Sequence, residues 1–221
     1  MNTKRKATNP IKQNTRLKEY IGWCTVFLFP FALLGVTETT RVALAAFLIY
    51  IGFNGFFLRS LIDNKFPYFE PKFKNVFHEL LGIAVALGIA AYMLFARSGV
   101  HQYSFKQTLM IIIFFVIIRG IFEQLISVNI FDLVGCKIKF PGYIAVILNT
   151  VLMYILFWDK FIIISTLNSS VIIVFQCILT FLSINIYHKT KDITICSVFQ
   201  ILFNVIIVFS CGFNINLYLA I

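Results

Sequence analysis

The sequence predicts an all-α protein, a polytopic transmembrane helix bundle of about seven spans. Of its 221 residues, 60% are hydrophobic and only 13% are charged, and the mean hydropathy is +0.89. A soluble domain of this composition would lack the polar surface needed to cover its core. Apolar runs of about 17–25 residues, the length that crosses a bilayer core, also recur along the chain. The predicted spans are 21–36, 42–58, 76–96, 108–131, 143–158, 170–187 and 193–213.

The chain begins with a basic tail, residues 1–20, in which six Lys and Arg residues outnumber one acid, Glu19. We expect a flexible cytoplasmic segment that touches anionic lipid and acts as a topology signal. The span 21–36 is short and contains Pro30, which predicts a kink. Loop 59–74 has two prolines and alternates aromatic with charged residues, so we expect it at the headgroup boundary.

Three segments follow from this pattern: the tail 1–20, an N-terminal hairpin with its loop over 21–75, and a transmembrane core over 76–221. Within the core, residues 161–169 are predicted either as a half-helix or as an extension of the sixth span. No internal repeat or soluble domain is visible in the sequence.

Lys and Arg residues gather on one predicted side of the membrane. With the N-terminus inside, the inner segments carry fourteen of the 19 Lys and Arg residues, the outer segments carry four, and Arg119 lies within a span. This asymmetry predicts a multi-pass cell-membrane protein with a cytoplasmic N-terminus and an outer C-terminus. The net charge of +10 therefore reflects topology. No basic face interleaved with aromatic residues indicates nucleic-acid binding.

Familiar catalytic and metal motifs are missing from the sequence. His78 opens HELLG, which differs from the HExxH zinc motif because Gly82 replaces the second histidine. We interpret His78 and Glu79 as a polar pair at the end of a span. The cysteines are odd in number and have no CxxC spacing, so we expect no disulfide framework. They are Cys24, Cys136, Cys177, Cys196 and Cys211.

The span 108–131 carries a cluster of ionisable and polar residues: Arg119, Glu123 and Gln124. A charge at membrane depth costs about 2.5–3.5 kcal/mol on insertion scales, so such residues face a protein interior and often mark function. Arg119 and Glu123 are four residues apart on one helix face and can neutralise each other. These positions are the first candidates for a functional site.

Other spans contribute uncharged polar residues. Gln200 and Asn204 are four apart in the last span, and Asn149 lies next to Thr150 in the fifth. At about 1.5 Å per residue, Glu123 and Gln200 lie at similar depth. We therefore predict a hydrogen bond between Glu123 and Gln200, of the kind that joins transmembrane helices.

The order of these features resembles the CAAX protease and bacteriocin-processing family (CPBP, also called Abi) of intramembrane proteases. That family carries EExxxR, FxxxH and HxxxN motifs in successive spans. The matching segments begin at Glu123, Met153 and Gln200. The first keeps only its leading glutamate, and the third keeps only its asparagine. The replaced positions are Gln124, Val128, Met153, Phe157 and Gln200. The segment IYHKTKDITICSVFQILFNVI also resembles the family's loop into the third motif.

The resemblance implies roles for two residues, Glu123 as a general base and Asn204 as an oxyanion donor. Family members use their histidines and asparagine as metal ligands or oxyanion stabilisers, so a divalent metal follows from the resemblance alone. No cofactor or metal site follows from the residues themselves. Enzyme activity stays open, because a general base alone supplies only about 10²–10⁴-fold. Arg119 and Asn149 are the predicted supporting residues.

Three hypotheses follow. In the first, a catalytically degenerate CPBP-like protein binds a membrane peptide or a protein partner, as in bacteriocin immunity or scaffolding. In the second, an active intramembrane endopeptidase uses Glu123. In the third, Arg119 and Glu123 line a polar pathway of a small transporter or channel component.

Overall fold

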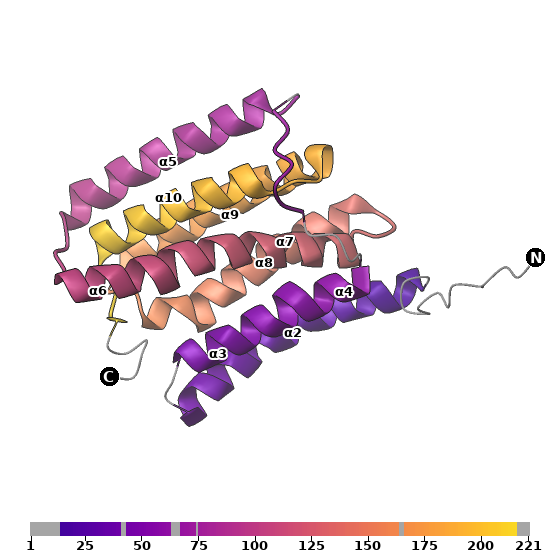
Figure 1. The fold of residues 1–221 in the computed structure, drawn as a ribbon, viewed down its shortest axis with the longest axis horizontal. Helices are drawn as coiled ribbons and strands as arrows, with labels where there is room; N and C mark the ends of the chain where they lie inside the picture. The colour runs from indigo at the N-terminus through magenta and orange to yellow at the C-terminus, as the bar shows by residue number, and fades with distance from the viewer. Residues whose placement is uncertain (1–13, 41–42, 63–66, 74, 164–165, 216–221) are drawn as a thin grey trace, which may run out of the picture.

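Long helices lie along one another in the computed structural model (Figure 1). The structure describes residues 14–40, 43–62, 67–73, 75–163 and 166–215. Within these residues, seven helices are long and apolar enough to cross a membrane, and no strand is present beyond an isolated bridge between Ile162 and Phe213. The predicted all-α class and number of spans are confirmed. Most of the predicted basic tail and parts of loop 59–74 lie outside the described residues.

The N-terminal hairpin consists of α2 and a second helical segment. The second segment is α-helical at both ends and π-helical in its middle. The bounds are α2 Thr15–Thr40, α3 Ala43–Tyr50, η1 Ile51–Phe57 and α4 Leu58–Ile62. Helix α2 is longer than the predicted span 21–36 and continues through Pro30. Its early start has a local reason, because the Asn14 side chain accepts a hydrogen bond from the Leu17 N–H at 3.1 Å.

The remaining helices lie within residues 77–211. The fourth span is one continuous rod that passes from α6 through the π-helix η2 into α7. The bounds are α5 Phe77–Ser98, α6 Phe105–Met110, η2 Ile111–Ile118, α7 Arg119–Val134, α8 Lys139–Leu156, the 3₁₀ turn η3 Trp158–Lys160, α9 Thr166–Thr190 and α10 Thr194–Cys211. The rod begins with a capping box, in which the Ser104 hydroxyl accepts from the Gln107 N–H and the Gln107 side chain accepts from the Ser104 N–H.

Helix α7 is the centre of the bundle. It contacts α2, α8, α9 and α10, and twelve of its 16 residues are buried. Gly120 allows α10 to approach closely, because a Cβ built at Gly120 would lie 2.6 Å from Ile201 Cγ1 and 3.1 Å from the Ile201 backbone nitrogen. Side chains on α7 are therefore positioned from several directions at once.

Large apolar side chains are exposed on the outer faces, whereas polar side chains are buried inside, the reverse of a soluble protein. Leu28, Ile155 and Val174 are all more than half exposed, while Arg119, Gln176 and Asn204 are wholly buried. This distribution fits a multi-pass membrane protein.

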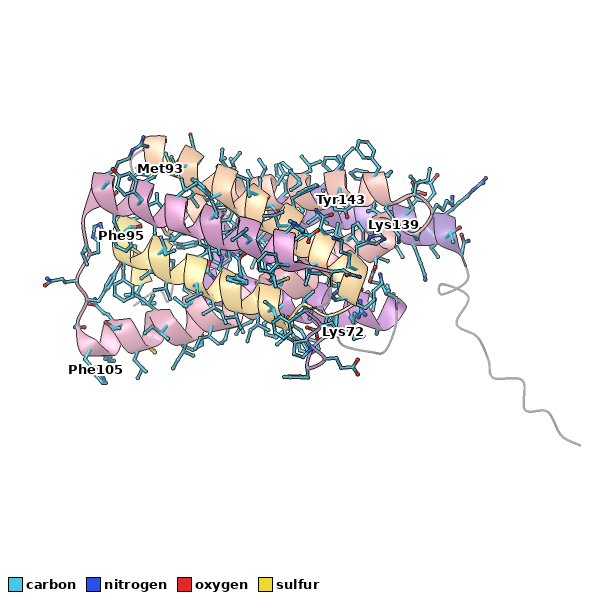
Figure 2. All side chains as sticks on the ribbon, turned by 90° about the horizontal axis from the view of Figure 1, so that it is seen from above. Lys72, Met93, Phe95, Phe105, Lys139 and Tyr143 are labelled. Carbon is cyan, nitrogen blue, oxygen red and sulfur yellow. The ribbon has the colours of Figure 1, made fainter. Side chains whose placement is uncertain are left out.

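Helix α2 begins at one end of the bundle, and α10 ends at the opposite end (Figure 1). Figure 2 shows Lys72 and Lys139 at the first end and Phe105 at the other.

Two connections between helices are fixed by hydrogen bonds to other parts of the bundle. Loop residues 67–73 dock on the bundle: the Tyr68 hydroxyl donates to the Ile121 carbonyl oxygen at 2.7 Å, and the Ile193 N–H donates to the Pro67 carbonyl oxygen at 2.8 Å. Residues 161–163 are not a half-helix, because their backbone pairs with the chain after α10. The Asn214 N–H donates to the Phe161 carbonyl oxygen at 2.8 Å. Helix α9 begins at Thr166, so the extension of the sixth span is confirmed from that residue on.

Candidate functional site

The candidate site is built around Arg119, where the π-helix η2 passes into α7. The Arg119 Nε lies 3.1 Å from a Glu123 carboxylate oxygen, so the pair expected from the four-residue spacing is formed. The side chain of Arg119 is 0% exposed and that of Glu123 is 15% exposed. Such a pair is stable away from water only if both charges have further partners.

Aromatic rings surround the Arg119 guanidinium. Its carbon lies 4.1 Å from the ring centre of Trp158, 4.5 Å from that of Phe115 and 5.0 Å from that of Tyr154. The Arg119 Nη2 also donates to the Tyr154 hydroxyl at 2.5 Å. Cation–π contacts of desolvated groups contribute about 2 kcal/mol or more, so the cage offsets part of the cost of burying this charge.

Gln200 on α10 joins the charged pair to other helices. Its Nε2 lies 3.2 Å from the Glu123 carboxylate and 2.9 Å from the side-chain oxygen of Gln176 on α9. The predicted hydrogen bond between Glu123 and Gln200 is confirmed. Gln124 Nε2 donates to the Gln200 side-chain oxygen at 3.1 Å. Four helices thus meet in one network, because Tyr154 on α8 donates to Gln176 at 3.5 Å.

Asn204 lies one turn beyond Gln200 and reaches the π-helix. Its Nδ2 donates to the Val116 carbonyl oxygen at 3.3 Å, and its Oδ1 lies 3.5 Å from Gln200 Nε2. Val116 belongs to η2, and π-helical turns occur frequently at functional sites. Glu123, Gln200 and Asn204 therefore belong to one hydrogen-bonded group.

Several polar atoms of this buried region have no hydrogen-bond partner within the described part of the chain. Two are donors, on Arg119 and Gln176, and two are acceptors, on Gln124 and Asn149. An unsatisfied buried polar atom costs about 1–3 kcal/mol. Buried atoms in this region can therefore still donate and accept further hydrogen bonds.

The remaining motif positions are packing residues. Val128 and Met153 are buried, and Phe157 is buried in an aromatic cluster with Trp158 and Phe161 at ring-centre distances of 4.8 and 5.3 Å. Met153 and Phe157 are both packed inside the bundle. Phe157 supports the site indirectly, since its neighbour Trp158 forms part of the arginine cage.

A second polar cluster, between α4, α7 and α9, was missed from the sequence. The Arg59 Nη1 lies 3.2 Å from an Asp132 carboxylate oxygen, which also accepts a hydrogen bond from the Tyr187 hydroxyl. Arg59 Nη1 further donates to Asn129 at 3.4 Å. Asn129 and Asp132 lie three residues apart on α7, and this spacing was a usable signal, but Arg59 was placed in a loop.

The side chains at the motif positions do not fit a divalent metal. The donors around Glu123 are a guanidinium and an amide N–H group, both of which direct hydrogens at the carboxylate oxygen. A divalent cation bound at Glu123 would need further carboxylate, imidazole or thiolate ligands beside it. The described residues contain no group of three or more His, Cys, Asp or Glu side chains arranged to hold a metal ion.

Other residues singled out from the sequence lie away from this site. Glu79 lies in the first turn of α5 and pairs with Lys189 on α9 at 2.5 Å. The five cysteines are free. Outside the spans, burial raises the pKa of the Tyr68 hydroxyl, which keeps it protonated as a donor to the Ile121 carbonyl.

No family model matches this chain, and the searches found no curated protein and no solved structure with significant similarity to it.

Proposed function

We propose that this chain is a CPBP-like integral membrane protein whose peptidase site has degenerated, and that it binds a membrane peptide or a membrane protein partner. Bacteriocin immunity and scaffolding are functions of this kind. The observation that carries the proposal is an open apolar groove on the outer face of α8 and α9. The groove has a volume of about 430 Å³ and is lined by Tyr143, Ile144, Ile147, Leu148, Val151 and Phe181.

The groove suits an apolar helix. Its α8 lining repeats at three- and four-residue intervals, which places Ile144, Leu148 and Val151 along one face. Transmembrane helices associate by close packing of such ridges and grooves, without a hydrophobic driving force between them. The Tyr143 hydroxyl donates to the Asn185 side chain at 2.7 Å and joins α8 to α9 beside the groove. This hydrogen bond therefore fixes the position of α8 relative to α9 beside the groove.

The central network supports a binding role over a catalytic one. A general base must be free to take a proton from water or substrate. In Glu123, one carboxylate oxygen, Oε2, instead accepts hydrogen bonds from Arg119 Nε at 3.1 Å and Gln200 Nε2 at 3.2 Å. Both contacts tie it to the packing of α7 and α10.

Site-specific photo-cross-linking in intact membranes tests the binding role. A photoreactive phenylalanine replacing Ile147 is expected to form an adduct with one peptide of defined mass. The matched control replaces Val198, which is 53% exposed on α10 and does not line the groove. That position is expected to give lipid adducts only.

A second pair of variants tests whether the adduct forms by binding in the groove or by random contact in the membrane. Val151→Trp fills the groove and is expected to remove the adduct formed from position 147. Leu202→Trp on the exposed face of α10 is expected to leave that adduct unchanged. Lipid adducts alone at position 147, or an adduct that survives Val151→Trp, would overturn the proposal.

The peptidase alternative is favoured by one observation, which is that the Glu123 side chain keeps 15% exposure while Arg119 keeps none. It predicts that the purified protein cleaves a fluorogenic transmembrane peptide and that Glu123→Gln abolishes this cleavage without changing the unfolding midpoint. Cleavage that persists in Glu123→Gln would eliminate this alternative.

A further inference from the structure

A small pocket lies where the first turns of α2 meet the turn between α7 and α8. It encloses about 220 Å³ and is lined by Arg16, Glu19, Tyr20, Trp23 and Lys137. This volume is below the range of about 300–1,000 Å³ that is typical for drug-sized ligands and cofactors. The pocket therefore suits a compact polar group.

The pocket carries charges of both signs. Arg16 and Lys137 supply two cations, and Glu19 supplies one carboxylate. The Lys137 Nζ lies 3.6 Å from a Glu19 carboxylate oxygen, and both side chains are more than one-third exposed. An exposed ion pair at this separation contributes little to stability, so either side chain can leave it to bind another charged group. Both charges are thus available to a ligand that carries the opposite charges.

The pocket is also fixed in place by packing. A Cβ built at Gly22 would lie 2.5 Å from a Val134 side-chain carbon, so α2 and the end of α7 are in direct contact. The Cys136 thiol lies 3.3 Å from the Thr15 carbonyl oxygen, at the start of α2. The two walls of the pocket cannot separate without breaking these contacts.

The position along α2 is that of a membrane interface. The helix changes there from the charged segment TRLKEY to the apolar segment IGWCTVFLF. Tyr and Trp are enriched at this level of a bilayer, where their rings pack on acyl chains and their polar groups meet headgroups. Tyr20 is 68% exposed, and Trp23 stacks on Phe27 at a ring-centre distance of 6.0 Å. A ligand in this pocket would arrive from the headgroup layer.

We propose that this pocket binds the headgroup of a phospholipid that carries a primary amine, such as phosphatidylethanolamine. Arg16 and Lys137 bind the phosphate, for which Lys and Arg are the usual partners. Glu19 accepts hydrogen bonds from the ammonium group, and the rings of Tyr20 and Trp23 face the same cation. The acyl chains continue along the apolar part of α2. This inference does not depend on the peptide-binding proposal.

Native mass spectrometry of the full-length protein in detergent tests the site with three lipids: phosphatidylethanolamine, phosphatidylcholine and phosphatidylglycerol. Wild type is expected to bind phosphatidylethanolamine most tightly. The double variant Arg16→Gln, Lys137→Gln is expected to weaken the binding of all three lipids about three- to tenfold, because the phosphate of each lipid loses its two cationic partners. Glu19→Gln is expected to lower phosphatidylethanolamine binding to the level of phosphatidylcholine and to leave phosphatidylcholine unchanged.

The matched control is the ion pair at the opposite end of the bundle, between Lys160 and Glu38 at 3.1 Å. Lys160→Gln and Glu38→Gln are expected to change none of the three affinities. Arg16→Lys keeps the charge and is expected to retain binding. Equal binding of phosphatidylethanolamine and phosphatidylcholine by wild type, strongest binding of phosphatidylglycerol, or equal losses in the pocket and control variants would overturn the proposal.

Discussion

Arg119 is buried completely, and its charge is met by a carboxylate, a hydroxyl group and three aromatic rings. Removing one member of a buried ion pair is more damaging than removing both, because the remaining charge stays without a partner. Arg119 and Glu123 should therefore behave as a unit in their effect on folding.

Arg119→Leu is expected to lower the free energy of unfolding by about 3–5 kcal/mol, because it leaves the Glu123 carboxylate buried without its cation. The double variant Arg119→Leu, Glu123→Leu is expected to recover part of that loss. Unfolding in mixed detergent micelles, followed by circular dichroism, measures both. A double variant that is less stable than Arg119→Leu would show that the two residues are not coupled in this way.

Gln200→Leu is expected to destabilise the protein by about 1–2 kcal/mol, because Gln200 takes part in several interhelical hydrogen bonds of roughly 0.6 kcal/mol each. Val198→Leu, on the exposed face of the same helix, is the control and should be nearly neutral. The same unfolding titration measures both variants. Equal effects of the two substitutions would mean that the amide network does not hold α10.

At the scale of elements, the rod of α6, η2 and α7 sets the geometry of the site. Its last section, α7, packs against four other long helices, and Gly120 removes the side chain at its closest approach to α10. The π-helical turn η2 brings the Val116 carbonyl to Asn204. The site thus depends on the spacing between α7 and α10.

Gly120→Ala is expected to destabilise the protein by about 1–3 kcal/mol, because the added methyl group overlaps Ile201 Cγ1 and the Ile201 backbone. Gly88→Ala on α5 is the matched control, since a Cβ there meets no atom within 4 Å. It should be neutral or slightly stabilising because alanine favours helix. A neutral Gly120→Ala, measured by the same titration, would contradict the close approach of α7 and α10.

Local patterns predicted part of this site, and packing decided the rest. The pairing of Arg119 with Glu123 follows from helical periodicity, and the contact of Glu123 with Gln200 follows from depth in the membrane. The contacts of Gln176 and Trp158 could not be predicted, because they depend on how α8 and α9 are rotated about their axes. Arg59 was missed because hydropathy alone ended its helix too early.

At the scale of the molecule, basic residues distinguish the two ends of the bundle. One end holds Arg16 in the first turn of α2, Lys137 in the turn after α7 and Lys189 in the last turn of α9. The other end holds Arg97 in the last turn of α5 and Lys160 in η3. The positive-inside rule then predicts that the N-terminus is cytoplasmic. With seven spans, the same rule predicts an outer C-terminus.

Reporter fusions test this orientation. Green fluorescent protein at the N-terminus is expected to fluoresce, and alkaline phosphatase at the C-terminus is expected to be active, because each folds only in its own compartment. An inactive C-terminal phosphatase together with a fluorescent C-terminal fusion would require an even number of spans.

The central claim is that this protein binds a membrane peptide without cleaving it. The measurement that tests it most directly compares the mass of the peptide cross-linked at position 147 in wild type and in Glu123→Gln. We expect the same mass in both, because the Glu123 carboxylate serves the packing of α7 and α10. A shorter peptide in wild type and a longer one in Glu123→Gln would show that Glu123 cleaves the bound chain, and would contradict the claim.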